Sequence, residues 1–218
     1  MMKLFVFEHC PYCIKAMMMK GLKKLSLDFV YLQNHDVTAR TEKVGANVVP
    51  ILQKDDGSYM AESMDIVHYL DQLDNNPVLT AEVNAERVAE WLDQVRHWTH
   101  LLLFPRWMKI DLPEFQYQQA INWFTKNKST MIGMSFDEAF HQSSETIERI
   151  NRKFTELEKW LLLPSLRGNR LSYDDIHLFP ALRNCTVIKG LVMPPVVRRY
   201  IDEVAELTDI RLFDDEAL

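Results

Sequence analysis

Two cysteines separated by two residues stand where an apolar run gives way to a helix-forming segment. Residues 3–7 (Lys-Leu-Phe-Val-Phe) form a short run that ends at Glu8 and His9, and a run of this kind is typical of a buried strand. The motif Cys10-Pro11-Tyr12-Cys13 follows, and residues 12–24 are rich in Met, Lys, Ala and Leu, which favour a helix. Because proline is tolerated in the first helical turn, the pattern predicts that Cys10 lies at a helix N-terminus.

The next sixty residues complete an α/β arrangement around this motif. We expect strands at 27–33, 49–54 and 58–61 and helices at 38–44 and 63–73. The resulting order, β-α-β-α-β-β-α, joins a βαβ unit to a hairpin. A Cys-x-x-Cys motif after the first strand of such a unit is typical of a thioredoxin-like domain.

The pattern changes at Asp74-Asn75-Asn76-Pro77, where polar turn formers indicate a linker. We therefore predict a thioredoxin-like domain over 1–74, a linker over 75–83 and an all-helical domain over 84–218. The candidate helices of the second domain cover 82–108, 115–128, 136–162, 173–189 and 195–208.

Two local signals concern the ends of these helices. Pro105 is expected to kink or end the first of them, because proline lacks the N–H that a helix interior needs. Ser172 and Asp175 fit a capping box, and Leu171 and Ile176 stand where a hydrophobic staple would place them.

Composition excludes several classes of protein. The formal net charge of the 218 residues is −6, whereas a nucleic-acid-binding protein would need a basic patch. No stretch reaches the roughly 18 apolar residues expected of a membrane span, and the apolar N-terminal run is too short for a secretory signal. With three cysteines, two of them in a Cys-x-x-Cys motif, the expected location is the reducing cytoplasm, where such a pair serves chemistry or metal binding.

The placement of Cys10 favours thiol–disulfide exchange, in which a thiolate attacks a disulfide sulfur. Unpaired N–H groups and the helix dipole favour an anion at a helix N-terminus. In Cys-x-x-Cys motifs this lowers the pKa of the first cysteine to roughly 3.5–7.5. Cys13 lies in the first helical turn, so Cys10 is interpreted as the attacking thiol and Cys13 as the resolving one.

Other interpretations of the cysteines remain open at this point. The pair could be buried small hydrophobes, or half of a metal site. A tetrahedral zinc site usually needs a second Cys or His pair, and no second Cys-x-x-Cys is present, so no metal is expected. Cys185 is interpreted as a buried helical cysteine, and His9 as a residue at the end of a strand rather than a base.

Two further segments are candidates for binding an extended peptide such as glutathione. Val49-Pro50 places a proline at the start of a strand, and a cis bond there would leave the Val49 backbone free for pairing. Ser63 is a natural N-cap for the helix that follows Glu62, and a helix N-terminus binds carboxylates. Tyr12 either packs on the substrate or covers the motif.

The chain resembles the large, two-domain glutaredoxins of enterobacteria, the glutaredoxin 2 family. The most specific stretches are Val49-Pro50-Ile51-Leu52-Gln53-Lys54-Asp55-Asp56 and Glu62-Ser63-Met64-Asp65-Ile66-Val67-His68-Tyr69. In the helical part they are Asp174-Asp175-Ile176-His177-Leu178-Phe179-Pro180 and Leu182-Arg183-Asn184. The resemblance implies a glutathione-transferase-like architecture, with a thioredoxin-like α/β domain followed by an all-α domain.

The same resemblance implies roles for individual residues. Cys10 would attack glutathionylated substrates, Cys13 would resolve protein disulfides, and glutathione would be the co-substrate that regenerates the enzyme. Val49 would bind the cysteinyl backbone of glutathione beside a cis Pro50, and Glu62 and Ser63 would hold its γ-glutamyl end. The chain has Val-Val-Pro where small glutaredoxins have Thr-Val-Pro. At the γ-glutamyl site it has Glu62-Ser63, a pattern similar to that of glutathione transferases, so the assignments at that end rest on the transferase analogy.

The function expected is that of a glutathione-dependent thiol–disulfide oxidoreductase, acting as a monomer on glutathionylated or disulfide-containing proteins. A glutathione transferase is the first alternative, because it would share the fold, but such enzymes commonly use Ser or Tyr where this chain has a cysteine. An iron–sulfur module is the second, and Pro11 is thought to disfavour it. No nucleic acid or membrane partner is expected.

Overall fold

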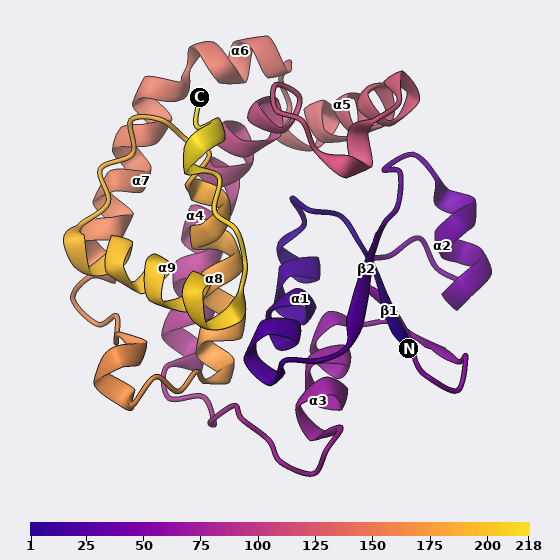
Figure 1. Cartoon of the computed structure of the whole chain (residues 1–218). Coiled ribbons are helices and arrows are strands. Elements are labelled where there is room, and N and C mark those ends of the chain that lie inside the picture. The colour runs from indigo at the N-terminus through magenta and orange to yellow at the C-terminus, as the bar shows by residue number, and fades with distance from the viewer. The chain divides into compact units, whose positions relative to one another are not determined.

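The computed structural model covers all 218 residues and begins with an α/β segment (Figure 1). Its strands are β1 (Met2–Val6), β2 (Leu27–Tyr31), β3 (Ile51–Gln53) and β4 (Tyr59–Met60). Its helices are α1 (Pro11–Lys23), α2 (Val37–Val44) and α3 (Ser63–Gln72). The predicted order of seven elements is confirmed, with boundaries that differ by at most two residues.

The four strands form one sheet in the order β2-β1-β3-β4. β1 is parallel to β2, in the register Leu4↔Phe29, and antiparallel to β3, in the register Phe5↔Ile51. β4 is antiparallel to β3 and therefore runs in the same direction as β1. α1 and α3 pack together on one side of the strands, and α2 lies on the other side (Figure 1).

The central position of β1 explains its composition. Four of its five residues are buried, because helices cover both faces of a strand in the middle of such a sheet. Ile14 and Met18 of α1 and Ile66 of α3 are fully buried as well. Each such side chain contributes about 1.5–3 kcal/mol through removal from water, so this packing fixes where α1 begins.

The rest of the chain is helical, as predicted. The helices are α4 (Ala85–Trp107), α5 (Gln118–Ile132), α6 (Phe136–His141), α7 (Ser143–Leu157), α8 (Tyr173–Cys185) and α9 (Pro195–Thr208). Three short 3-10 helices accompany them, η1 (Pro113–Phe115), η2 (Pro164–Arg167) and η3 (Asp214–Glu216). No helix of the chain is long and apolar enough to cross a membrane.

One helix predicted from the sequence is wrong as a single element. The segment predicted as one helix over 136–162 forms two helices, because Gln142 leaves the helical conformation (φ −85°, ψ 7°) and begins α7 as its N-cap. No Gly or Pro marks this break in the sequence, so a pattern of local propensities could not detect it. Pro105 does lie in the last turn of α4, two residues before the helix ends.

Contacts divide the chain into two compact units. The first comprises residues 1–78, 111–124 and 208–210, and the second comprises 79–110, 125–207 and 211–218. In the second unit α4 packs against α6, α7 and α8, and the Trp91 indole N–H donates to the Lys153 carbonyl at 3.0 Å. The sequence boundaries at 74 and 84 stay a prediction, but two later segments clearly contribute to the first unit.

Gly21 of α1 lies close to the backbone of Thr208 in the first unit. A Cβ added there would lie 1.9 Å from the carbonyl oxygen of Thr208, far inside van der Waals contact. We expect Gly21→Ala to lower the free energy of unfolding by about 1–3 kcal/mol, because overpacking against rigid backbone forces the segments apart. Chemical denaturation would measure the loss.

Gly45, which ends α2, is the matched control for this substitution. It has a positive φ of 72° and no atom within 4 Å of an added Cβ, so Gly45→Ala meets only the conformational penalty of about 1 kcal/mol. Equal losses for the two variants would contradict the steric explanation for Gly21.

Candidate functional site

The topology of the sheet places the predicted site residues at the same end of its strands. β1 and β4 run in the same direction, so α1 and α3, which follow them, both begin at the edge where these strands end. β3 runs the opposite way and begins at this edge, directly after Val49-Pro50. The Cys10 motif, the Val49-Pro50 pair and the Glu62-Ser63 pair are therefore gathered there from separate parts of the sequence.

Cys10 is the N-cap of α1 and has extended backbone angles (φ −77°, ψ 117°), as the sequence predicted. Its N–H donates to the Phe7 carbonyl at 3.3 Å, and its own carbonyl accepts the first helical hydrogen bond from Ile14 at 3.1 Å. These bonds hold the residue at the turn between β1 and α1. The helix N–H groups that lack partners consequently surround its sulfur.

The two thiols of the motif differ in exposure. Cys10 is partly exposed, whereas Cys13 is fully buried. The N–H of Phe7 donates to Sγ of Cys13 at 3.4 Å, which anchors the buried thiol against the end of β1. Only Cys10 is therefore accessible to a reacting partner.

The two thiols also differ in acidity. A hydrogen bond from Cys13 lowers the pKa of Cys10 to about 6, with further lowering by the charge of His9 and by backbone N–H groups, although burial acts in the opposite direction. Burial raises the pKa of Cys13 well above its ordinary value, and the interaction with Cys10 raises it further. At neutral pH Cys10 is a thiolate and Cys13 is a thiol that donates a hydrogen bond to it.

His9 lies between the end of β1 and the motif, and it is buried with Glu114 of η1. Its Nδ1 is 2.5 Å from Oε1 of Glu114, and its backbone N–H donates to the same oxygen at 3.0 Å. The first unit thus includes a buried carboxylate from a segment more than a hundred residues away. Neither the pairing nor Glu114 itself was identified from the sequence, because no motif or periodicity marks the η1 segment.

The Val49–Pro50 peptide bond is cis, as the resemblance implied. Val49 is half-buried, and neither its N–H nor its C=O pairs with another backbone group of the chain. An unpaired N–H and C=O at a strand end can bind an extended peptide through main-chain hydrogen bonds.

Glu62 and Ser63 differ from the prediction in one respect. The N-cap of α3 is Glu62, not Ser63, and Ser63 is the first helical residue. The reason is the backbone of Glu62, whose φ of 67° lies in the left-handed region and cannot continue the helix. The exposed Glu62 carboxylate and the first N–H groups of α3 are consequently presented together, a combination that suits an amino acid group with an amine and a carboxylate.

Tyr12 is exposed to 59% and lies beside the motif. The ammonium of Lys15, one helical turn further along α1, lies 5.4 Å from the centre of the Tyr12 ring.

The third cysteine, Cys185, is buried at the end of α8, and burial raises its pKa to about 12. It is therefore the inert helical cysteine that the sequence indicated.

Comparisons with known proteins agree with this geometry. The model of the glutaredoxin 2 C-terminal domain matches residues 87–217, and the glutathione S-transferase N-terminal domain matches residues 4–78. Glutaredoxin 2 of Escherichia coli K12 is 41% identical over 217 residues, with full coverage of both chains. The chain belongs to the glutaredoxin 2 family. It is accordingly an oxidoreductase, and the resemblance seen in the sequence is confirmed.

Solved structures support the same assignment. Glutaredoxin 2 of Salmonella typhimurium, determined in complex with glutathione, has a TM-score of 0.94, at 41% identity, and the match covers 100% of this chain and 99% of that one. A glutathione S-transferase of Ceriporiopsis subvermispora has a TM-score of 0.72 at 14% identity, with 97% and 98% covered. The second likeness shows the fold alone, and it confirms the predicted glutathione-transferase-like architecture.

Proposed function

We propose that this member of the family reduces protein–glutathione mixed disulfides and protein disulfides, with Cys10 as the attacking thiol, Cys13 as the resolving thiol and glutathione as the reductant. The observation that carries the proposal is the contrast between the two sulfurs. One is partly exposed with a pKa of about 6, and the other is buried with its pKa raised. Attack requires an accessible thiolate.

The first step transfers glutathione to the enzyme. The Cys10 thiolate attacks the glutathione sulfur of a mixed disulfide, the S–S bond to the substrate protein breaks, and the substrate leaves as a thiolate that takes up a proton. A second glutathione thiolate then attacks the Cys10–glutathione disulfide. Oxidised glutathione leaves and the Cys10 thiolate is restored, so one glutathione thiol is consumed for each substrate thiol released, and the other half of the oxidised glutathione comes from the mixed disulfide.

Cys13 is needed only where the substrate itself is a disulfide within a protein. After attack by Cys10, the mixed disulfide joins the enzyme to the substrate. Cys13 then loses its proton and attacks Cys10, which forms the Cys10–Cys13 disulfide and releases the substrate dithiol. Glutathione reduces this disulfide in two further exchanges.

Glutathione would bind at the end of the sheet where β1 and β4 end and β3 begins. Its cysteinyl backbone would form hydrogen bonds with the Val49 backbone beside Pro50. Its γ-glutamyl amine would pair with the Glu62 carboxylate, and its α-carboxylate would accept hydrogen bonds from N–H groups at Ser63. Tyr12 would cover the tripeptide. The glutathione complex of the Salmonella relative supports a site for this ligand in the family.

The setting proposed for this reaction is the cytoplasm, where the glutathione pool keeps thiols reduced. The partners are glutathionylated or disulfide-containing proteins, and the enzyme acts as a monomer. We propose no nucleic-acid or membrane partner for the enzyme.

The test is a comparison of two assays on the purified protein. We expect glutathione-dependent reduction of the mixed disulfide of hydroxyethyl mercaptan and glutathione, with little conjugation of glutathione to chlorodinitrobenzene, because a cysteine thiolate forms a disulfide with glutathione instead of activating its thiol. Conjugation without disulfide reduction would overturn the proposal in favour of a transferase. Iron and visible absorbance after anaerobic purification, without reductase activity, would favour a cluster-binding module.

A further inference from the structure

The pair formed by His9 and Glu114 is the most deeply buried ionisable contact near the redox motif. The Glu114 side chain is completely buried and the His9 side chain is 10% exposed. Burial raises the pKa of Glu114, but the hydrogen bond and the charge of His9 outweigh this, so that its pKa lies below the ordinary value. Glu114 is therefore a carboxylate, and His9 must donate from Nδ1.

A buried carboxylate needs a countercharge, because an isolated one is strongly disfavoured away from water. His9 is the one cationic group that forms an ion pair with Glu114. The second carboxylate oxygen, Oε2, is buried without a hydrogen-bond partner. The stability of the carboxylate consequently depends on its two contacts with His9, through Nδ1 and through the backbone N–H.

Three aromatic rings surround the imidazole. Phe7 and Phe115 stack on it, with ring centroids at 5.9 and 5.3 Å, and Phe124 approaches at 5.2 Å in an edge arrangement. Ring faces attract a cation, and stacking fixes the plane of the ring. These contacts hold the charge of His9 in one position next to Cys10 in the chain.

The other charged groups around this part of the first unit have different partners. Glu8 accepts from the Tyr31 hydroxyl at 2.8 Å. Lys15 is near Tyr12, and the charge of Cys10 raises its pKa while burial, the larger effect, lowers it. Arg40 lies over the Phe7 ring, 5.2 Å from its centre, and donates to the carbonyls of the β2–α2 loop.

We propose that Glu114 is a positioning residue for the redox reaction, which fixes the His9 ring beside Cys10 so that Cys10, and not Cys13, is the sulfur that ionises. The proposal deepens the function proposed above and rests on it. Glu114 acts on Cys10 through His9, which contacts its carboxylate.

The two members of the His9–Glu114 pair affect the pKa values of the two thiols in opposite directions. The positive charge of His9 lowers the pKa of Cys10, and the negative charge of Glu114 raises the pKa of Cys13. One ion pair thus increases the difference between the thiols. The β2–α2 loop holds Glu114 in place. The Asn34 N–H donates to the Glu114 carbonyl at 3.0 Å, and the Gln33 side-chain amide donates to the Pro113 carbonyl at 2.8 Å.

The experiment compares Glu114→Gln with the wild type. Glutamine preserves the volume and an acceptor for the His9 N–H groups, but removes the negative charge. Iodoacetamide alkylation is followed across pH, and mass spectrometry identifies the labelled cysteine. The wild-type rate should rise through about pH 6, because the thiolate is the reactive form, and the midpoint should be about one unit higher in Glu114→Gln.

A double-mutant cycle separates this role from a purely structural one. In a His9→Gln background, Glu114→Gln should leave the midpoint unchanged or lower it, because only the repulsion between the carboxylate and the thiolate is then removed. A structural role would lower the thermal unfolding temperature without this reversal. Glu8→Gln, which removes another buried carboxylate of the same turn, is the matched control and should leave the pH profile of alkylation unchanged.

The outcomes distinguish the inference from the proposed function. Labelling of Cys10 with the same midpoint in Glu114→Gln and the wild type would overturn the role of Glu114 and leave the assignment of Cys10 intact. Labelling at another cysteine would overturn the assignment of Cys10 itself. A raised midpoint in Glu114→Gln that persists in the His9→Gln background would also contradict the proposal, because the effect would not pass through His9.

Discussion

Replacement of Cys10 by serine is expected to abolish turnover with both mixed disulfides and protein disulfides. A serine hydroxyl is not ionised near neutral pH, so the low pKa that the Cys13 hydrogen bond, the charge of His9 and the helix N–H groups give to the Cys10 sulfur has no equivalent in the variant. The loss should reach the detection limit of the assay, because attack by the thiolate begins every reaction of the cycle. Steady-state reduction with glutathione and a coupled reductase would measure it.

Replacement of Cys13 by serine should give a different pattern. Glutathione itself resolves the Cys10–glutathione disulfide, so reduction of mixed disulfides should persist, whereas reduction of a dithiol substrate through the Cys10–Cys13 disulfide should be lost. The serine hydroxyl still donates a hydrogen bond to Cys10, which preserves the largest cause of its low pKa. If Cys13→Ser were as inactive as Cys10→Ser with mixed disulfides, the division of roles would be wrong.

The Cys13→Ser variant also allows the protein substrates to be identified. Without the resolving thiol, the mixed disulfide between Cys10 and a protein disulfide substrate should accumulate. Mass spectrometry of the trapped species would then name the partner. A control with Cys10→Ser should trap nothing.

The largest effect on stability is expected from Asp175→Ala in α8. The Asp175 carboxylate is buried and accepts the Ser172 N–H at 2.6 Å, the Tyr200 hydroxyl at 2.8 Å and both terminal nitrogens of Arg167 at 2.9 and 3.0 Å. Alanine leaves all of these donors without their partner. Loss of one member of a buried charge pair costs about 3–5 kcal/mol, and urea denaturation would show it as a lower midpoint.

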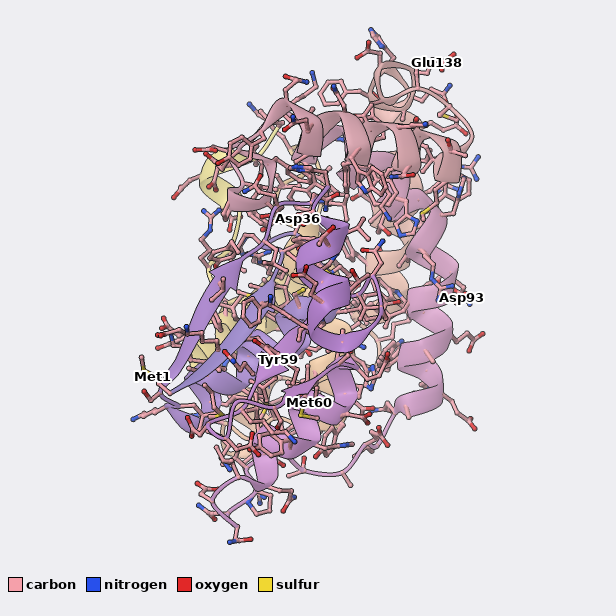
Figure 2. All side chains as sticks on the ribbon, turned by 90° about the vertical axis from the view of Figure 1, so that its right-hand side faces the viewer. Met1, Asp36, Tyr59, Met60, Asp93 and Glu138 are labelled. Carbon is pink, nitrogen blue, oxygen red and sulfur yellow. The ribbon has the colours of Figure 1, made fainter.

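Asp93 of α4 provides the control for this substitution. It projects from the helix (Figure 2), its side chain is 71% exposed, and its ion pair with Arg96 is solvated. Such a pair contributes about 0–1 kcal/mol, so Asp93→Ala should change the midpoint little. Similar losses of stability in the two variants would refute the interpretation that Asp175 is the centre of a buried hydrogen-bond network.

The capping box at α8 shows how far local sequence reaches. Ser172 and Asp175 were identified from their spacing alone, and the carboxylate does accept the Ser172 N–H. Asp36, which caps α2 by accepting from the Ala39 N–H at 2.9 Å, lies at the start of its helix in the same way (Figure 2). Arg167 and Tyr200 were not identified, because nothing within a few residues of Asp175 indicates which distant side chains complete its network.

The same division applies to the redox site. The strand before Cys10, the proline after it and the helix formers beyond were sufficient to predict a cysteine at a helix N-terminus, because these interactions act between near neighbours. The error at Ser63 arose from the same reliance on propensity. Serine is a favourable N-cap, but the left-handed backbone of Glu62 starts the helix one residue earlier than propensity suggests.

The sequence by itself determined the motif, the order of elements and the family, since each depends on local pattern or on recognisable segments. Only the tertiary structure decided that the two thiols differ in burial and that Glu114 lies against His9. The reason is physical: desolvation and buried ion pairs depend on which residues pack together, and packing joins segments whose separation in sequence carries no signal.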